Sequence, residues 1–222
     1  MLTLDLITKI LPKSDINLMA AFVDAFNKYA PTYGLDTPDR ISCFVGNSVV
    51  ESGLKPIKEG GSNARKIKLY WTRLKKRLEF GHTSAQDALD YSGKGYIQIT
   101  GKRNYALISK NLYGDDRLIQ NPNLVLTPDV AMLTSLEWWK INKMNDVADK
   151  FGIKGVAGKI NTGNPRSTKT LHLPERIKAY NLILSSFNQN FFARNSIRKP
   201  KHPFINFTKG NFAKSFFKSI IS

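Results

Sequence analysis

Two acidic residues, eight positions apart, have the residue type and the surroundings for acid–base chemistry. Glu51 ends an apolar, helix-like segment, and Glu59 follows a break in the helical pattern at Gly53 and Pro56. Hydrolysis of a glycosidic bond by inversion uses a carboxylic acid for the leaving oxygen and a carboxylate for the attacking water, roughly 6.5–9.5 Å apart. A continuous helix would rotate the two side chains away from each other, but the break lets the chain fold back. Glu51 is therefore a candidate acid in partly desolvated surroundings, and Glu59 a candidate base among glycines and lysines.

A glycine-spaced motif further along the chain supplies polar side chains for the same chemistry. Gly93 and Gly95 predict a turn that feeds an extended run. Gln98 and Thr100 stand two apart in that run, so on a short strand both would face the same side. We expect them to form a second wall of a cleft.

The motifs resemble those of glycoside hydrolase family 19, and within it the phage endolysin branch. The resemblance covers roughly residues 2–186 and rests on Val49-Val50-Glu51-Ser52-Gly53, Tyr91-Ser92-Gly93-Lys94-Gly95-Tyr96-Ile97-Gln98-Ile99-Thr100-Gly101, Asn104-Tyr105 and Ile160-Asn161-Thr162-Gly163. It implies a lysozyme-like, mainly α fold of α+β type, with a minimal strand element and a substrate cleft between helical lobes.

The resemblance also implies a role for each matching residue. Glu51 would be the general acid, Glu59 the base, and Thr100 would hold the attacking water. The implied substrate-binding residues are Tyr96, Gln98, Asn104, Asn161 and Arg176. Arg176 would also support the acid pair by its charge.

The chain departs from the family pattern at three places. Val50 stands where the family has histidine, Lys94 where it has arginine, and Thr162 where it has glycine. Glu79 and Asp87 therefore remain alternatives to Glu59 as the base.

Start signals along the chain predict mainly helices. Thr37 and Pro38 cap a helix over 38–52, Ser14 caps an earlier one, and an apolar stripe predicts a helix over 66–78. Two more begin near 128 and 173. We expect one catalytic domain over 1–187, followed by a basic, phenylalanine-rich segment over 188–222.

Composition indicates a polyanionic partner. The chain has 34 Lys and Arg against 17 Asp and Glu, a net charge of +17, and its basic residues concentrate in 55–77 and after residue 176. Charge alone does not identify this partner; the resemblance implies bacterial peptidoglycan. The lone Cys43, in an apolar helical pattern, is expected to be a buried thiol, and we expect neither a metal nor a cofactor.

The C-terminal segment is expected either to dock on the core as a helix over 209–221 or to bind anionic outer-membrane lipid or lipopolysaccharide. Its phenylalanines alternate with basic residues, and the candidate envelope-binding residues are Arg198, Lys199, Lys201, Lys209, Lys214 and Lys218. The N-terminus lacks a basic region typical of signal peptides. With no export signal, the resemblance implies an enzyme that waits in a host cytoplasm and reaches the periplasm and cell wall through a separate holin. We expect it to be a monomer.

Two other interpretations stay open at this point. A lytic transglycosylase would cleave the same polymer with one glutamate and no second carboxylate. A basic nucleic-acid-binding protein would use the same charge, but no nucleic-acid-binding motif is present, so no such partner is expected. The sequence does not fix the host or the bond that is cut.

Overall fold

The computed structural model describes the backbone of residues 1–197 and the side chains through residue 188. Residues 1–189 form one compact unit, and a second unit begins at Asn190, inside the last helix. The six candidate envelope-binding residues and the helix expected over 209–221 lie outside the described residues.

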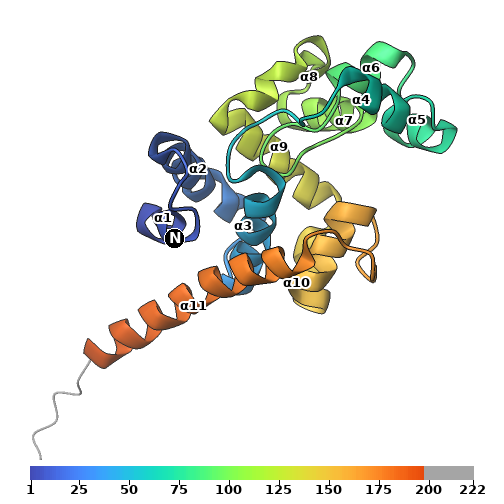
Figure 1. The fold of residues 1–222 in the computed structure, drawn as a ribbon. Helices are drawn as coiled ribbons and strands as arrows, with labels where there is room; N and C mark the ends of the chain where they lie inside the picture. The colour runs from blue at the N-terminus through green and yellow to red at the C-terminus, as the bar shows by residue number, and fades with distance from the viewer. Residues whose placement is uncertain (198–222) are drawn as a thin grey trace, which may run out of the picture. The chain divides into compact units, whose positions relative to one another are not determined.

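The described chain is mainly helical, as the sequence predicts, and its only β pairing is a pair of isolated bridges (Figure 1). In chain order the elements are α1 (Leu4–Ile10), α2 (Ile16–Tyr29), η1 (Ala30–Tyr33), α3 (Pro38–Ser52), α4 (Asn63–Tyr70), α5 (Leu74–Phe80), α6 (Ala85–Asp90), α7 (Lys102–Tyr113), α8 (Arg117–Gln120), η2 (Pro122–Leu126), α9 (Pro128–Ile141), α10 (Met144–Thr162) and α11 (Leu173–Ile197).

Helix α3 has the bounds that the sequence predicts. The Thr37 hydroxyl accepts a hydrogen bond from the Arg40 amide at 3.3 Å, and Pro38 opens the helix. Gly53 ends it in the left-handed region at φ 61°, a conformation that glycine adopts without strain. The start of α2 was predicted one residue early, because Asp15 rather than Ser14 accepts the capping bonds.

The single helix predicted over 66–78 is wrong. The chain leaves the helical conformation at Arg73, with φ −81° and ψ 100°, so that α4 and α5 are separate short helices. Leu74 and Leu78 are 59% and 68% exposed, so the apolar spacing that suggested a buried stripe does not correspond to one buried face. The first and second halves of the pattern belong to two different helices.

Helix α3 runs through the core, packs against α10, and is crossed by α11 (Figure 1). Phe44 on α3 contacts Phe26 of α2 and Trp139 of α9, with ring centroids 5.7 and 5.3 Å apart. The neighbouring Cys43 is fully buried, and burial raises the pKa of its thiol to about 12, which makes it unreactive as expected.

The crossing of α3 and α11 depends on Gly46. A Cβ atom at this position would lie only 3.0 Å from the backbone nitrogen of Tyr180, so the two helices approach at backbone distance. The contact fixes the first turns of α11 against the second half of α3. Residues one turn away on each helix, Arg176 and Glu51, are thereby brought together.

The described helices include none that is both long and apolar enough to cross a membrane. Nor do the described residues hold a cluster of three or more histidine, cysteine or acidic side chains that could bind a metal ion.

Candidate active site

Glu51 lies at the C-terminal end of α3, where its side chain is 18% exposed. Its Oε1 accepts a hydrogen bond from Nη2 of Arg176 at 2.7 Å. Within the described part of the chain, Oε2 accepts no hydrogen bond and so stays available to a substrate. The carboxyl group is thus held at one oxygen only.

Arg176 lies in the first turn of α11 with its side chain 2% exposed. Besides Glu51, its guanidinium donates to Oδ1 of Asn47 at 2.8 Å and to the carbonyl of Leu171 at 3.2 Å. Buried guanidinium groups require such pairing. The prediction that Arg176 contacts substrate is wrong, because the buried side chain lies behind the acid; its charge lies beside Glu51, as the resemblance implied.

Glu59 lies on a segment that pairs with the glycine-spaced motif. The Glu59 amide donates to the Gly93 carbonyl at 2.7 Å, and the Gly95 amide donates to the Ile57 carbonyl at 3.0 Å. Glycine at position 93 leaves room for this pairing, because an added Cβ would lie 3.0 Å from the Gln98 amide oxygen and 3.4 Å from the Glu59 Cβ. Backbone hydrogen bonds therefore place Glu59 opposite the motif.

The Glu59 carboxylate accepts hydrogen bonds from two donors. The Tyr70 hydroxyl lies 3.0 Å from both Oε1 and Oε2, and the Gly93 amide donates to Oε2 at 3.2 Å. Burial and the nearby Glu59 charge raise the pKa of Tyr70 above its usual range, so the phenol keeps its proton and remains a donor. Sequence reasoning missed this residue because its spacing assigned it to an apolar helix face.

The glycine-spaced motif forms a tight turn in place of the predicted strand. Lys94 and Ile99 exchange backbone hydrogen bonds at 3.2 and 2.9 Å, and Gln98 between them has a left-handed φ of 57°. The strand prediction failed because the positive φ interrupts the alternation of a strand. Gln98 and Thr100 nevertheless both line the cavity next to the two glutamates.

The two side chains of the turn are also tied to the backbone. The Gln98 amide nitrogen donates to the carbonyls of Ile57 at 3.1 Å and Gly95 at 2.9 Å, which leaves only its amide oxygen to meet a ligand. The Thr100 hydroxyl donates to the Gln98 carbonyl at 3.0 Å, so its oxygen is free to accept a hydrogen bond from a ligand.

Two adjoining cavities form a groove at the helix ends. The first, of about 430 Å³, is lined by both glutamates and also by Ile57, Gly60, Tyr70, Gly93, Ile97, Gln98, Thr100, Ile160 and Asn161. The second, of about 570 Å³, shares Tyr70, Ile97, Gln98, Thr100, Ile160 and Asn161 with the first and extends to Lys76, Glu79, Phe80, Ile99, Asn104, Trp138, Asn142, Lys159, Thr162 and Gly163. Sequence reasoning gave no signal for Trp138 and Lys159.

The remaining predicted residues divide between groove and core. Asn161 lines both cavities, and its Oδ1 accepts from the Leu171 amide at 3.1 Å. Asn104 lines the second cavity and donates to the Thr100 carbonyl at 2.7 Å. Tyr96 is wrong as a substrate-binding residue, because its side chain is fully buried and packs edge-on against Phe22, with ring centroids 4.8 Å apart.

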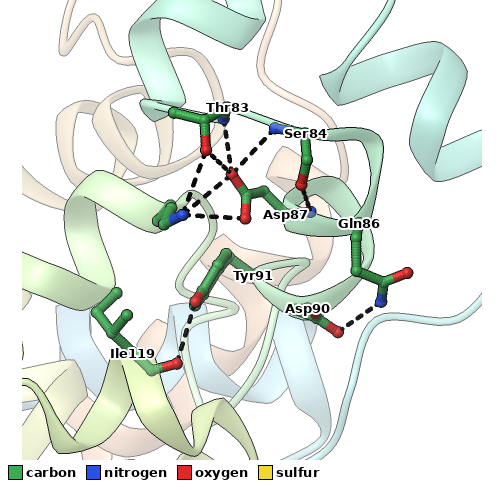
Figure 2. A network of polar contacts seen from close by, with 8 residues as sticks. Thr83, Ser84, Gln86, Asp87, Asp90, Tyr91 and Ile119 are labelled. Carbon is green, nitrogen blue, oxygen red and sulfur yellow. Dashed lines mark hydrogen bonds and ion pairs between the residues drawn. The ribbon is translucent and has the colours of Figure 1, made fainter.

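Neither alternative base lies with Glu51. Asp87 caps α6: its carboxylate accepts from the backbone of Thr83 and Ser84, and from Lys102 at 3.1 Å (Figure 2). Burial opposes ionisation there, but the bonds from Thr83 and Lys102 outweigh it and lower the pKa of Asp87. Glu79 lines only the second cavity and pairs with Lys76 at 2.9 Å.

Comparisons with known proteins agree with this architecture. No family model matches the chain. A glycosyl hydrolase family 19 domain-containing protein of Haemophilus influenzae is 30% identical over 112 residues, which is 50% of this chain and 50% of that protein. The chain thus spans about half the length of the curated relative that it matches.

Solved structures show the same fold. Chitinase C from Streptomyces griseus superposes with a TM-score of 0.58 at 20% identity, covering 84% of this chain and 90% of that one. A bacterial family 19 chitinase superposes with a TM-score of 0.56 at 15% identity, covering 82% and 93%. The resemblance to family 19 glycoside hydrolases is confirmed, and the fold is the mainly α fold of the family's chitinases.

Proposed function

We propose that the chain is a glycoside hydrolase that cleaves β-1,4 bonds of bacterial peptidoglycan by inversion, as a phage-type endolysin that lyses its host. The observation that carries the proposal is that Glu51 and Glu59 line one cavity, each held by its own hydrogen-bond donors. The similarity to family 19 proteins and the chitinase fold support the reaction class.

We assign a step to each group on the basis of these contacts. Glu51 gives its proton to the leaving glycosidic oxygen while the bond from that oxygen to the anomeric carbon breaks. Glu59, oriented by Tyr70 and the Gly93 amide, takes a proton from a water molecule whose oxygen attacks the same carbon from the opposite face. The Thr100 oxygen accepts the second hydrogen of that water. Arg176 positions Glu51 and does not touch the sugar.

Digestion of purified peptidoglycan, followed by mass spectrometry, tests the bond and the mechanism. Hydrolysis gives products with free reducing ends. Glu51→Gln and Glu59→Gln should each lower the rate by at least ~10²-fold with the fold retained, because a positioned acid or base contributes about that much. Glu79→Gln is the matched control, since it removes a carboxylate from the second cavity only.

The same digestion distinguishes hydrolysis from the lytic transglycosylase reaction. Products ending in 1,6-anhydro sugars, with Glu59→Gln fully active, would assign the chain to the lytic transglycosylases. The lytic role has its own test: expression in a Gram-negative host should lyse the cells only when a pore-forming protein opens the inner membrane. Lysis that is the same for the Glu51→Gln variant would contradict it.

A further inference from the structure

The groove continues past the two glutamates into the second cavity, which has a different chemical character. Its walls combine aromatic rings, among them the half-buried Trp138, with amides of Asn142 and Asn161 and with two lysines, Lys76 and Lys159. Aromatic faces and amide groups suit N-acetylated sugar rings. A neutral sugar polymer offers no charge with which a cation there could form an ion pair.

The two lysines differ in how they are paired. Lys76 forms an ion pair with Glu79 at 2.9 Å and lies over the Phe80 ring at 5.1 Å from its centroid, so its charge is compensated within the protein. Lys159 is half-buried, and its ammonium group has no ion pair or hydrogen bond within the described part of the chain. An ammonium group that has no partner in the protein and belongs to a groove-lining side chain can form a charge-assisted hydrogen bond with an anionic ligand.

Lys159 lies beside another hydrogen-bond donor of the groove. It lies in the last turn of α10, two residues before Asn161, which lines both cavities. The Asn161 Oδ1 is taken by the Leu171 amide, while its NH₂ group makes no hydrogen bond with the described residues. Together the lysine and the amide offer donors only, which is the chemistry of a carboxylate-binding site.

We propose that Lys159 is a specificity-determining residue that binds a carboxylate on the glycan. Such carboxylates occur on the lactyl ether and peptide substituents that alternate sugars of peptidoglycan carry and that chitin lacks. The inference rests on the proposed function, and it adds that the enzyme selects acidic over neutral polymers of N-acetylated sugars through this one cation.

The test compares one glycan with and without its charge. Peptidoglycan strands stripped of peptide by an amidase expose the lactyl carboxylate, and carbodiimide coupling to a neutral amine removes the charge while leaving the sugar backbone. The wild-type protein should have a kcat/KM at least about fivefold higher on the acidic strands, a modest value that allows for solvent screening in an open groove. Lys159→Gln should bring that ratio close to one, and Lys159→Arg should keep it.

Lys154→Gln is the matched control, because Lys154 is an exposed lysine on the same helix that does not line the groove. Thermal unfolding of each variant separates recognition from the stabilisation that any lysine gives to a helix C-terminus. A ratio that Lys159→Gln leaves unchanged, or that Lys154→Gln abolishes equally, would overturn the proposal.

Binding keeps this test independent of catalysis. Titration calorimetry with the Glu51→Gln variant, with and without Lys159→Gln, measures the preference for acidic over uncharged strands directly. If the wild-type protein cleaves neither strand, the proposed function fails. Preferential binding that is lost with Lys159→Gln would still support the carboxylate site, and equal binding of both strands would refute it.

Discussion

Replacing Arg176 by methionine should destabilise the fold and misplace the acid at the same time. The buried guanidinium donates to Glu51 at 2.7 Å, to Asn47 at 2.8 Å and to the Leu171 carbonyl at 3.2 Å. Methionine is of similar length and donates none of these bonds. The variant therefore leaves a carboxylate, an amide oxygen and a carbonyl without their shared partner.

The size of the effect follows from the burial of the pair. Removing one partner of a buried ion pair costs about 3–5 kcal/mol. Glu51 is 18% exposed and can turn toward water, which favours the lower end, about 3 kcal/mol. For a protein of this length 1 kcal/mol corresponds to about 2–4 °C, so Tm should fall by about 6–12 °C.

Urea and thermal unfolding of Arg176→Met, Glu51→Gln and the double variant measure this directly. The double-mutant cycle should give a coupling of at least about 1 kcal/mol, because Arg176→Met removes the ion pair and Glu51→Gln removes its negative charge. Arg166→Met is the control, since Arg166 is exposed and its loss should stay within about 0.5 kcal/mol. A stable Arg176→Met variant, or an additive cycle, would refute the assignment of Arg176 as the support of Glu51.

The remaining predictions concern the base, the turn and a buried lysine. Tyr70→Phe should lower kcat about tenfold or more, because the hydroxyl orients both oxygens of Glu59; an unchanged kcat in the folded variant would show that the bond does not matter. Thr100→Val should lower activity about tenfold while unfolding free energy falls by only about 1 kcal/mol, and a large drop in Tm with normal activity per folded molecule would make Thr100 a structural residue. Burial, and after it the charge of Lys58, lowers the pKa of Lys94 to about 8 from its usual 10.5. Between these values the unfolded chain binds more protons than the folded one, so stability should rise with pH in that window. Between pH 7.5 and 9.5 the unfolding free energy of the wild-type protein, measured with urea, should rise by on the order of 2 kcal/mol more than that of Lys94→Met. The same pH dependence in both proteins would exclude the effect.

Local signals in the sequence predicted some of the helices well. The Thr37 cap and Gly53 bracket α3 because a hydroxyl cap and a left-handed glycine act within one turn of the chain. The break at Arg73 was not predictable in this way, since nothing local forbids a helix there. It depends on how α4 packs on α6 and how α5 packs on α7.

The sequence predicted which residues form the candidate site better than it predicted their burial and contacts. The sequence motifs identified Glu51, Glu59 and Thr100, all of which line one cavity. Tyr96 and Arg176 were assigned to substrate because motif membership does not reveal burial. The partnership of Tyr70 with Glu59 depends on a packing contact between two segments, which no spacing in the sequence encodes.

The main-chain pairing that places Glu59 has an evolutionary consequence. Backbone hydrogen bonds between residues 57–59 and 93–95 do not depend on the side chain at position 58, so that position can vary between related sequences. The register of the pairing is constrained, because a shift by one residue would turn the Glu59 side chain to the opposite side. Insertions between Gly53 and Lys58 must therefore be absorbed in the loop or be lost to selection. Mutational drift can erase the sequence signature of this segment while the carboxylate stays where it is.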